Sequence, residues 1–246
     1  YYMAINTQHK PLADVRVRQA INYAIDRNLW LKVAFAGLGK PATSAMPEGV
    51  QFYEKQSDPD YHYAPDKAKA LLKAAGYPNG LDLKLWVTNA TASVRAAQVL
   101  KAQLATVGIR ATVTPMDSGT RNAKLWGVQD PKKAEFGLYY GGWSTSTGDA
   151  DWALRPLFAT ESWVPTSYNV SYFSNPDVDK AIAAGLATAD PAKRGIAYAQ
   201  AQKLLWKEAP VAFLGTPDNL VGKRSTLNGV SMLPDGNLFF TQASFK

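Results

Sequence analysis

The sequence predicts an α/β fold with a largely parallel sheet. Short apolar stretches alternate with helical stretches of about ten to fifteen residues, as in successive βαβ units. The helical stretches begin and end at residues that commonly cap helices. Of the 246 residues, 46% are hydrophobic and 19% are charged, which is enough apolar material for a sizeable core. One large domain or two small ones fit this length.

The first quarter of the chain predicts a strand followed by two helices. Residues 1–6 alternate as a strand does. Asp14 is a suitable N-cap for a helix, and a second helix over 29–36 ends at Gly37. The apolar face of the first helix consists of Val17, Ala20, Ile21, Ala24 and Ile25. Residues 38–64 are rich in Gly, Pro, Ser and Asp and predict a long irregular loop.

The rest of the chain continues the alternation. Pro65 suits the first position of a helix, and Gly76 and Gly108 suit helix ends. We expect the helix that begins near Asp149 to end at Pro156, because proline lacks a backbone N–H. The tail after Thr216 contains Leu238, Phe239 and Phe240, which resemble strands without a partner. The remaining elements expected are helices over 65–75, 93–107, 118–126, 178–188 and 192–208, and strands over 81–88, 109–114, 135–140 and 211–214.

Composition narrows the function classes. The net charge is +7, but the basic residues are scattered, with short pairs such as Lys132–Lys133 and Lys223–Arg224. This pattern disfavours a nucleic-acid partner and leaves a small anionic ligand open. The absence of cysteine excludes disulfides and cysteine metal sites. No apolar stretch is long enough for a membrane span, and the first residues lack the pattern of a signal peptide.

No catalytic constellation can be assembled from the motifs. His9 and His62 are the only histidines, and neither has a nucleophile or metal-binding motif beside it. Asp149 and Asp151 are two residues apart at a helix start, which fits capping better than acid–base chemistry. Phosphate-binding glycine loops are missing as well. We therefore expect a binding protein without a metal or cofactor, not an enzyme.

The stretch over 139–158 is the candidate ligand-holding segment. A strand stops at Gly141–Gly142, a run of hydroxyl side chains over 144–147 follows, and a helix then begins. Strand ends and helix N-termini leave backbone groups that point into a crevice, and α/β folds commonly bind ligands there. The alternative is a surface loop that contains a buried Trp143.

Two arginines stand out as candidate ligand contacts. Arg95 lies in the first turn of the helix expected over 93–107, where backbone N–H groups favour an anion. The alternative is a solvated arginine on the helix flank. Arg155 lies between apolar neighbours and either contacts a ligand or pairs with Asp151 four residues earlier.

Two motifs carry a family resemblance. VRVRQAINYAIDR over 15–27 and YAPDKAKALLKAAGYPNG over 63–80 resemble the extracytoplasmic solute-binding proteins of peptide ABC transporters, family 5. The resemblance covers essentially the whole chain in order. It implies the C-terminal half of a two-lobed periplasmic-binding-protein-like fold (type II, large cluster), with the N-terminal half and its signal peptide absent. It also implies a periplasmic protein that delivers a peptide to a membrane permease.

The resemblance further implies a division of the chain. Residues 1–8 would be a strand crossing from the first lobe, 9–212 the ligand-binding α/β lobe, and 213–246 a return segment that packs on the first lobe. Arg95 aligns with an arginine that grips the ligand carboxylate in dipeptide-binding relatives.

Glutathione-binding members of the family are the most similar in the segment GWSTSTGDADWALRPLF over 142–158. Dipeptide- and oligopeptide-binding relatives have a tryptophan here, followed three residues later by an aspartate that captures the peptide ammonium group. Trp143 matches, but Ser146 stands in place of the aspartate, which suits a γ-linked peptide such as glutathione. A di- or oligopeptide receptor is the alternative ligand class, and a small-peptide hydrolase the alternative function. The expected ligand-binding residues are Arg95, Tyr140, Gly142, Trp143, Ser144, Thr145, Ser146 and Arg155.

Overall fold

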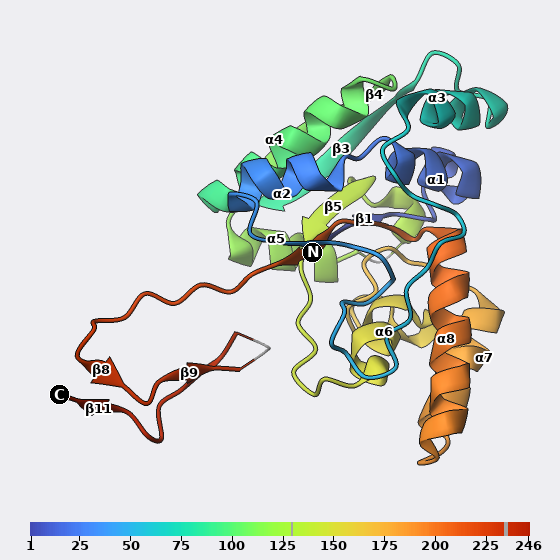
Figure 1. Cartoon of the computed structure of the whole chain (residues 1–246). Coiled ribbons are helices and arrows are strands. Elements are labelled where there is room, and N and C mark those ends of the chain that lie inside the picture. The colour runs from blue at the N-terminus through green and yellow to red at the C-terminus, as the bar shows by residue number, and fades with distance from the viewer. Residues whose placement is uncertain (129, 234–235) are drawn as a thin grey trace.

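A five-stranded sheet forms the centre of the computed structural model, which describes residues 1–128, 130–233 and 236–246 (Figure 1). The strand order is β4-β3-β5-β1-β6. The strands are β1 (Tyr2–Ile5), β3 (Leu81–Thr88), β4 (Ile109–Met116), β5 (Leu138–Gly141) and β6 (Val211–Phe213).

Strand direction corrects one part of the sequence prediction. β3 pairs in parallel with β4 and β5, but β1 pairs antiparallel with both β5 and β6. The sheet is therefore mixed, with β1 running against its four companions. Alternation within a strand shows which side chains share a face, but it does not encode the direction of a partner that is remote in sequence.

Helices cover both faces of the sheet (Figure 1). α2 packs on α4 and α1 on α3, whereas α6, α7 and α8 gather below the sheet in this view. None of the described helices is both long and apolar enough to cross a membrane. The α-helices are α1 (Val15–Tyr23), α2 (Arg27–Phe35), α3 (Pro65–Ala74), α4 (Thr91–Ala105), α5 (Ser118–Trp126), α6 (Ala150–Phe158), α7 (Pro176–Leu186) and α8 (Pro191–Glu208). Short 3-10 turns are η1 (Lys10–Ala13), η2 (Pro131–Lys133) and η3 (Thr160–Ser162).

The predicted helix caps are confirmed. The Asp14 side chain accepts a hydrogen bond from the backbone N–H of Arg16 and so begins α1. Pro65 is the first residue of α3. Gly76 and Gly108 have φ of +91° and +90°, the left-handed conformation that ends a helix and favours glycine.

Pro156 does not end its helix, contrary to the sequence prediction. α6 continues through Pro156 to Phe158. A residue with an N–H at position 156 would donate to the carbonyl of Trp152, one turn earlier. Here the indole Nε1 of Trp143 donates to that carbonyl at 2.8 Å. The acceptor freed by proline is therefore satisfied, which removes one reason for the helix to stop.

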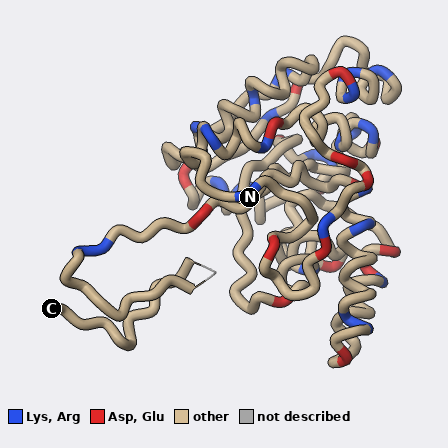
Figure 2. The backbone as a smooth tube through the Cα atoms, in the orientation of Figure 1, with Lys and Arg blue, Asp and Glu red and all other residues tan. Residues whose placement is uncertain are grey.

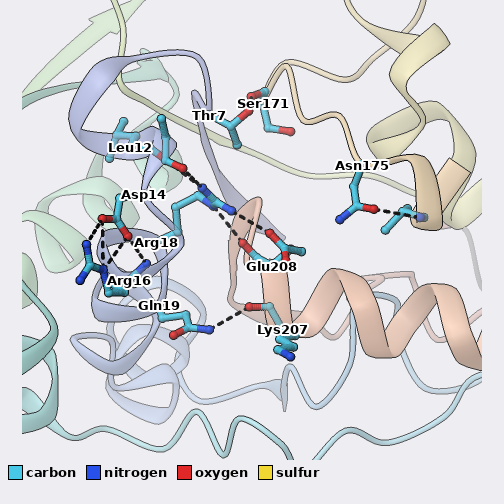
Figure 3. Close-up of polar contacts among 12 residues, drawn as sticks. Thr7, Leu12, Asp14, Arg16, Arg18, Gln19, Ser171, Asn175, Lys207 and Glu208 are labelled. Carbon is cyan, nitrogen blue, oxygen red and sulfur yellow. Dashed lines mark hydrogen bonds and ion pairs between the residues drawn. The ribbon is translucent and has the colours of Figure 1, made fainter. Parts of the chain in front are cut away.

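The family motif over 15–27 ties α1 to the end of α8 (Figure 3). The guanidinium of Arg18, which is buried, donates to the carbonyls of Leu12 and Ala13 and to the carbonyl and carboxylate of Glu208. Gln19 donates to the carbonyl of Lys207 at 2.9 Å. These bonds satisfy carbonyls that the end of α8 leaves without helical partners.

The segment over 38–64 is mostly irregular, as predicted, but it contains a short strand. β2 (Gly39–Pro41) pairs with β7 (Gly215–Pro217). Farther along, the segment is held on α8 by Gln202, whose amide bonds the hydroxyl of Ser44, the backbone N–H of Glu54 and the carbonyl of Phe52.

A long tail leaves the body after Pro217 (Figure 1). Two short antiparallel pairs form within it, so the apolar stretch at Leu238–Phe239 has a local partner. The backbone N–H of Asp218 donates to the carbonyl of Leu38, and beyond Asp218 the described backbone hydrogen bonds of the tail join tail residues to one another. Figure 2 shows Lys and Arg interspersed with Asp and Glu along the body. The tail strands are β8 (Leu227–Asn228), β9 (Ser231–Met232), β10 (Leu238–Phe239) and β11 (Ser244–Phe245).

Candidate functional site

Three parallel strands end at one edge of the sheet. Thr88, Met116 and Gly141 are the last residues of β3, β4 and β5, and the connections to α4, α5 and α6 begin there. The ladder between β3 and β5 stops at the pair Trp86–Tyr139, so the end of β5 pairs only with β1 in the sheet. Carboxyl ends of parallel strands where neighbouring connections diverge are the usual ligand position in α/β folds. This edge is the candidate site.

The loop over 142–149 is built from its own hydroxyl groups. Thr145 donates to the carbonyl of Asp149 at 3.3 Å, and the Thr147 hydroxyl accepts from the backbone N–H of Asp149 at 3.2 Å. Ser144 and Ser146 are exposed. Of the four predicted hydroxyl side chains, the two threonines therefore shape the loop, and the two serines are accessible to a ligand.

Trp143 lies in an aromatic cluster at this edge. Its ring is half-buried, with centroid distances of 4.8 Å to Tyr168 and 5.7 Å to Trp152. Trp126 of α5 contacts Tyr168 at 5.8 Å. Sequence reasoning identified only Trp143, because the other rings come from separate elements that no local spacing relates. We call Trp126, Trp143, Trp152 and Tyr168 the edge aromatic cluster.

Arg95 is exposed on α4. Among the residues described by the structure, its side chain has no hydrogen bond or ion pair. The helix begins at Thr91, two residues before the predicted start, so Arg95 lies in its second turn. The expectation that backbone N–H groups of the first turn assist it is therefore wrong, because helix-end effects fade beyond that turn. The guanidinium of Arg95 is nevertheless accessible to a ligand.

Arg155 forms the ion pair that was one of its two alternatives. Its Nε and Nη2 donate to the carboxylate of Asp151 at 2.8–3.1 Å, and this bonding raises the pKa of Arg155. Asp149 pairs with Arg194 of α8 at 2.8 Å. Both aspartates at the start of α6 are thus neutralised within the protein. Across the described ranges, no group of three or more His, Asp and Glu could hold a metal ion.

Tyr140 points into the core. Its side chain is 3% exposed and stacks on Tyr1 with a centroid distance of 5.7 Å. Neighbouring strand residues face opposite sides, so Tyr139 and Tyr140 cannot both face the same surface. Only the backbone of Tyr140 lies near the edge, and Gly142, which is exposed, continues from it.

Arg121 of α5 was missed by sequence reasoning. It is half-buried, and its positive charge acts on the phenols of Tyr2 and Tyr139. Burial raises the pKa of both phenols, and the nearby positive charge of Arg121 opposes that rise. The available signal was an arginine near the start of a helix expected directly after a strand.

Residues 1–164 match the family described as bacterial extracellular solute-binding proteins, family 5, middle. This match covers well over half of the chain. The chain belongs to that family. The predicted family and fold class are thereby confirmed.

Individual proteins extend the comparison. The glutathione-binding protein GsiB of Salmonella choleraesuis (strain SC-B67) is 40% identical over 246 residues, which is 100% of this chain and 48% of GsiB. HbpA2 from Haemophilus parasuis has a TM-score of 0.85 at 28% identity, covering 100% of this chain and 48% of HbpA2. The periplasmic binding protein DppA from Helicobacter pylori, in complex with peptide STSA, has a TM-score of 0.79 at 28% identity over 88% of this chain and 41% of DppA. The chain spans about half the length of these relatives.

Proposed function

We propose that this chain is the ligand-binding lobe of an ABC importer's solute-binding protein and that its ligand is glutathione. The observation that carries this proposal is the unpaired, exposed Arg95 near a strand edge whose acidic groups are already engaged. Asp149 and Asp151 have arginine partners, and Asp117 accepts hydrogen bonds from Thr120. A ligand with excess carboxylate charge fits such an edge. The similarity to GsiB supports the same ligand.

The position of Ser146 favours glutathione over an ordinary peptide. A receptor that captures an α-ammonium group needs a carboxylate in the binding loop. The exposed residue three positions after Trp143 is a serine. A hydroxyl suits a γ-linked peptide, whose ammonium and carboxylate groups are arranged differently. Trp143 lines the pocket, and the backbone at Gly142 and Ser144 pairs with the extended ligand.

In this role the protein makes no covalent change to its ligand. A second lobe closes over the edge, excludes water and commits the ligand to a membrane permease from the periplasm. Residues 1–8 cross from that lobe, 9–212 form the lobe described here, and 213–246 return to pack on the other lobe. A peptide hydrolase is disfavoured because the sequence offers no nucleophile with an adjacent base.

Isothermal titration of the full-length protein with reduced glutathione, with the dipeptide Gly-Leu as comparator, tests the ligand. We expect glutathione alone to bind. Binding of Gly-Leu alone would agree with the family assignment but would exclude glutathione as the ligand. In the same assay Arg95→Ala should weaken glutathione binding by about 1–3 kcal/mol, because a charge-assisted hydrogen bond is lost.

Arg110→Ala is the matched control for Arg95→Ala. Arg110 is exposed and lies at the opposite end of β4, where it pairs with Asp82. The control removes the same charge and should leave the affinity unchanged. An Arg95→Ala protein that binds as tightly as this control would remove Arg95 from the site.

A further inference from the structure

Arg121 is held against the sheet at the candidate edge. It is the fourth residue of α5, which begins directly after β4. In the ladder between β1 and β5, Tyr2 lies opposite Gly141 and Ala4 opposite Tyr139. Tyr2 and Tyr139 are therefore diagonal neighbours on one face, and the positive charge of Arg121 acts on both phenols.

The charge of Arg121 has no counterion among the described residues. Its guanidinium donates to the neutral amide oxygen of Asn122 at 2.7 and 3.1 Å. No carboxylate in the described part of the chain lies within 4.0 Å of it. The hydrogen bonds to Asn122 are exposed, so the guanidinium is accessible to a negative group from solution. Arginines that do have a carboxylate partner are Arg16, Arg18, Arg110, Arg155 and Arg194.

Arg121 and Arg95 approach the edge from opposite faces of the sheet. Lys124 of α5 lies 5.6 Å from the ring centroid of Trp86, which shares a face with Tyr139. α4 packs with α2 on the other side (Figure 1). One carboxylate cannot bind a guanidinium on each face, so the two arginines suit two separate negative groups.

We propose that Arg121, with the hydroxyls of Tyr2 and Tyr139, binds a second ligand carboxylate distinct from the one held by Arg95. This inference rests on the proposed function and deepens it. The site selects short peptides that carry two separated carboxylates, with the edge aromatic cluster beside the chain that joins them. Arg121 is thus a specificity-determining residue: it discriminates a diacid from the same peptide with one carboxylate masked.

The test compares reduced glutathione with two analogues, one amidated at the glycine carboxylate and one at the glutamyl α-carboxylate. Calorimetry on the full-length protein should show that each amide binds about 10- to 100-fold more weakly than glutathione. Arg121→Gln should bind glutathione no better than the wild type binds one of these amides. The variant should no longer distinguish glutathione from that amide. Arg95→Gln should no longer distinguish glutathione from the other amide. Arg121→Lys, which keeps the charge but not the planar fork, should be intermediate.

Arg110→Gln serves as the charge-matched control and should keep both discriminations. If Arg121→Gln also keeps both with unchanged affinity, the second carboxylate position is wrong, while the glutathione proposal stands. If both arginine variants lose the same discrimination, the two side chains share one carboxylate and the inference again fails. Failure of the wild type to bind any of the three compounds would overturn the proposed function itself.

Discussion

Buried arginines give the family motif over 15–27 its structural meaning. Arg27 is buried, and it donates to the carbonyl of Phe213 at 2.6 Å, to that of Tyr61 at 2.7 Å and to the side-chain oxygen of Asn22 at 3.0 Å. Desolvation lowers its pKa to about 10, so the group is still charged at neutral pH. One side chain thereby joins α2, the loop before α3 and the end of β6. The motif therefore forms a structural junction and supplies none of the candidate ligand contacts.

Arg27→Met should therefore reduce the free energy of unfolding by about 2–4 kcal/mol, because buried carbonyls lose their donors. Urea unfolding followed by tryptophan fluorescence measures the change. Arg110→Met, which breaks an exposed pair with Asp82, should cost much less. Equal losses in the two variants would show that the buried network contributes nothing beyond a surface ion pair.

At the scale of the element, α6 shows how a tertiary contact overrides a local rule. Proline in a helix interior removes one backbone hydrogen bond. In α6 the carbonyl left free, that of Trp152, accepts from the indole of Trp143. Trp143 thus both closes the binding loop onto α6 and compensates for Pro156. Its indole N–H is occupied in this arrangement, which leaves the ring as the part of Trp143 available to a ligand.

A double-mutant cycle tests this compensation. Trp143→Phe should destabilise the protein by about 1–2 kcal/mol, because the Trp152 carbonyl loses its donor. In a Pro156→Ala background the alanine N–H can take that carbonyl, so the same substitution should cost less. The difference between the two losses, measured by urea unfolding, is the coupling energy. Additive losses would mean that the indole bond and the proline are independent.

The elements also show what the sequence could and could not predict. The bounds of β3 and α5 agree with the expected ranges, because alternation and capping act over a few residues. The direction of β1 depends on partners that are distant in the chain, and the length of α6 depends on a side-chain contact across the preceding loop. Local patterns contain neither. The same limit applies to the site. The loop over 142–149 was identified from its composition, whereas the influence of Arg121 on both Tyr2 and Tyr139 depends on the pairing of β1 with β5.

At the scale of the whole molecule, a compact body carries an extended, apolar tail (Figure 1). Asp218 makes the last backbone bond to the body, to the carbonyl of Leu38. Beyond it, large apolar side chains are exposed, with Phe245 at 74% and Phe240 at 56%. Exposed apolar surface of this kind marks an interaction site. In the proposed function, residues 213–246 pack on a second lobe, which would cover this surface.

The 246-residue chain on its own should therefore associate through its tail. A chain ending at Asp218 loses the exposed residues Leu220, Phe240 and Phe245 but keeps the pairing of β2 with β7. We expect it to elute as a monomer, to bind less of a hydrophobic dye and to unfold within a few degrees of the longer chain, since the sheet and its helices are unchanged. Gel filtration with light scattering and a thermal melt measure these properties. A large fall in the melting temperature would mean that the tail stabilises this lobe directly. Monomers of both lengths would mean that the exposed apolar side chains of the tail do not drive association.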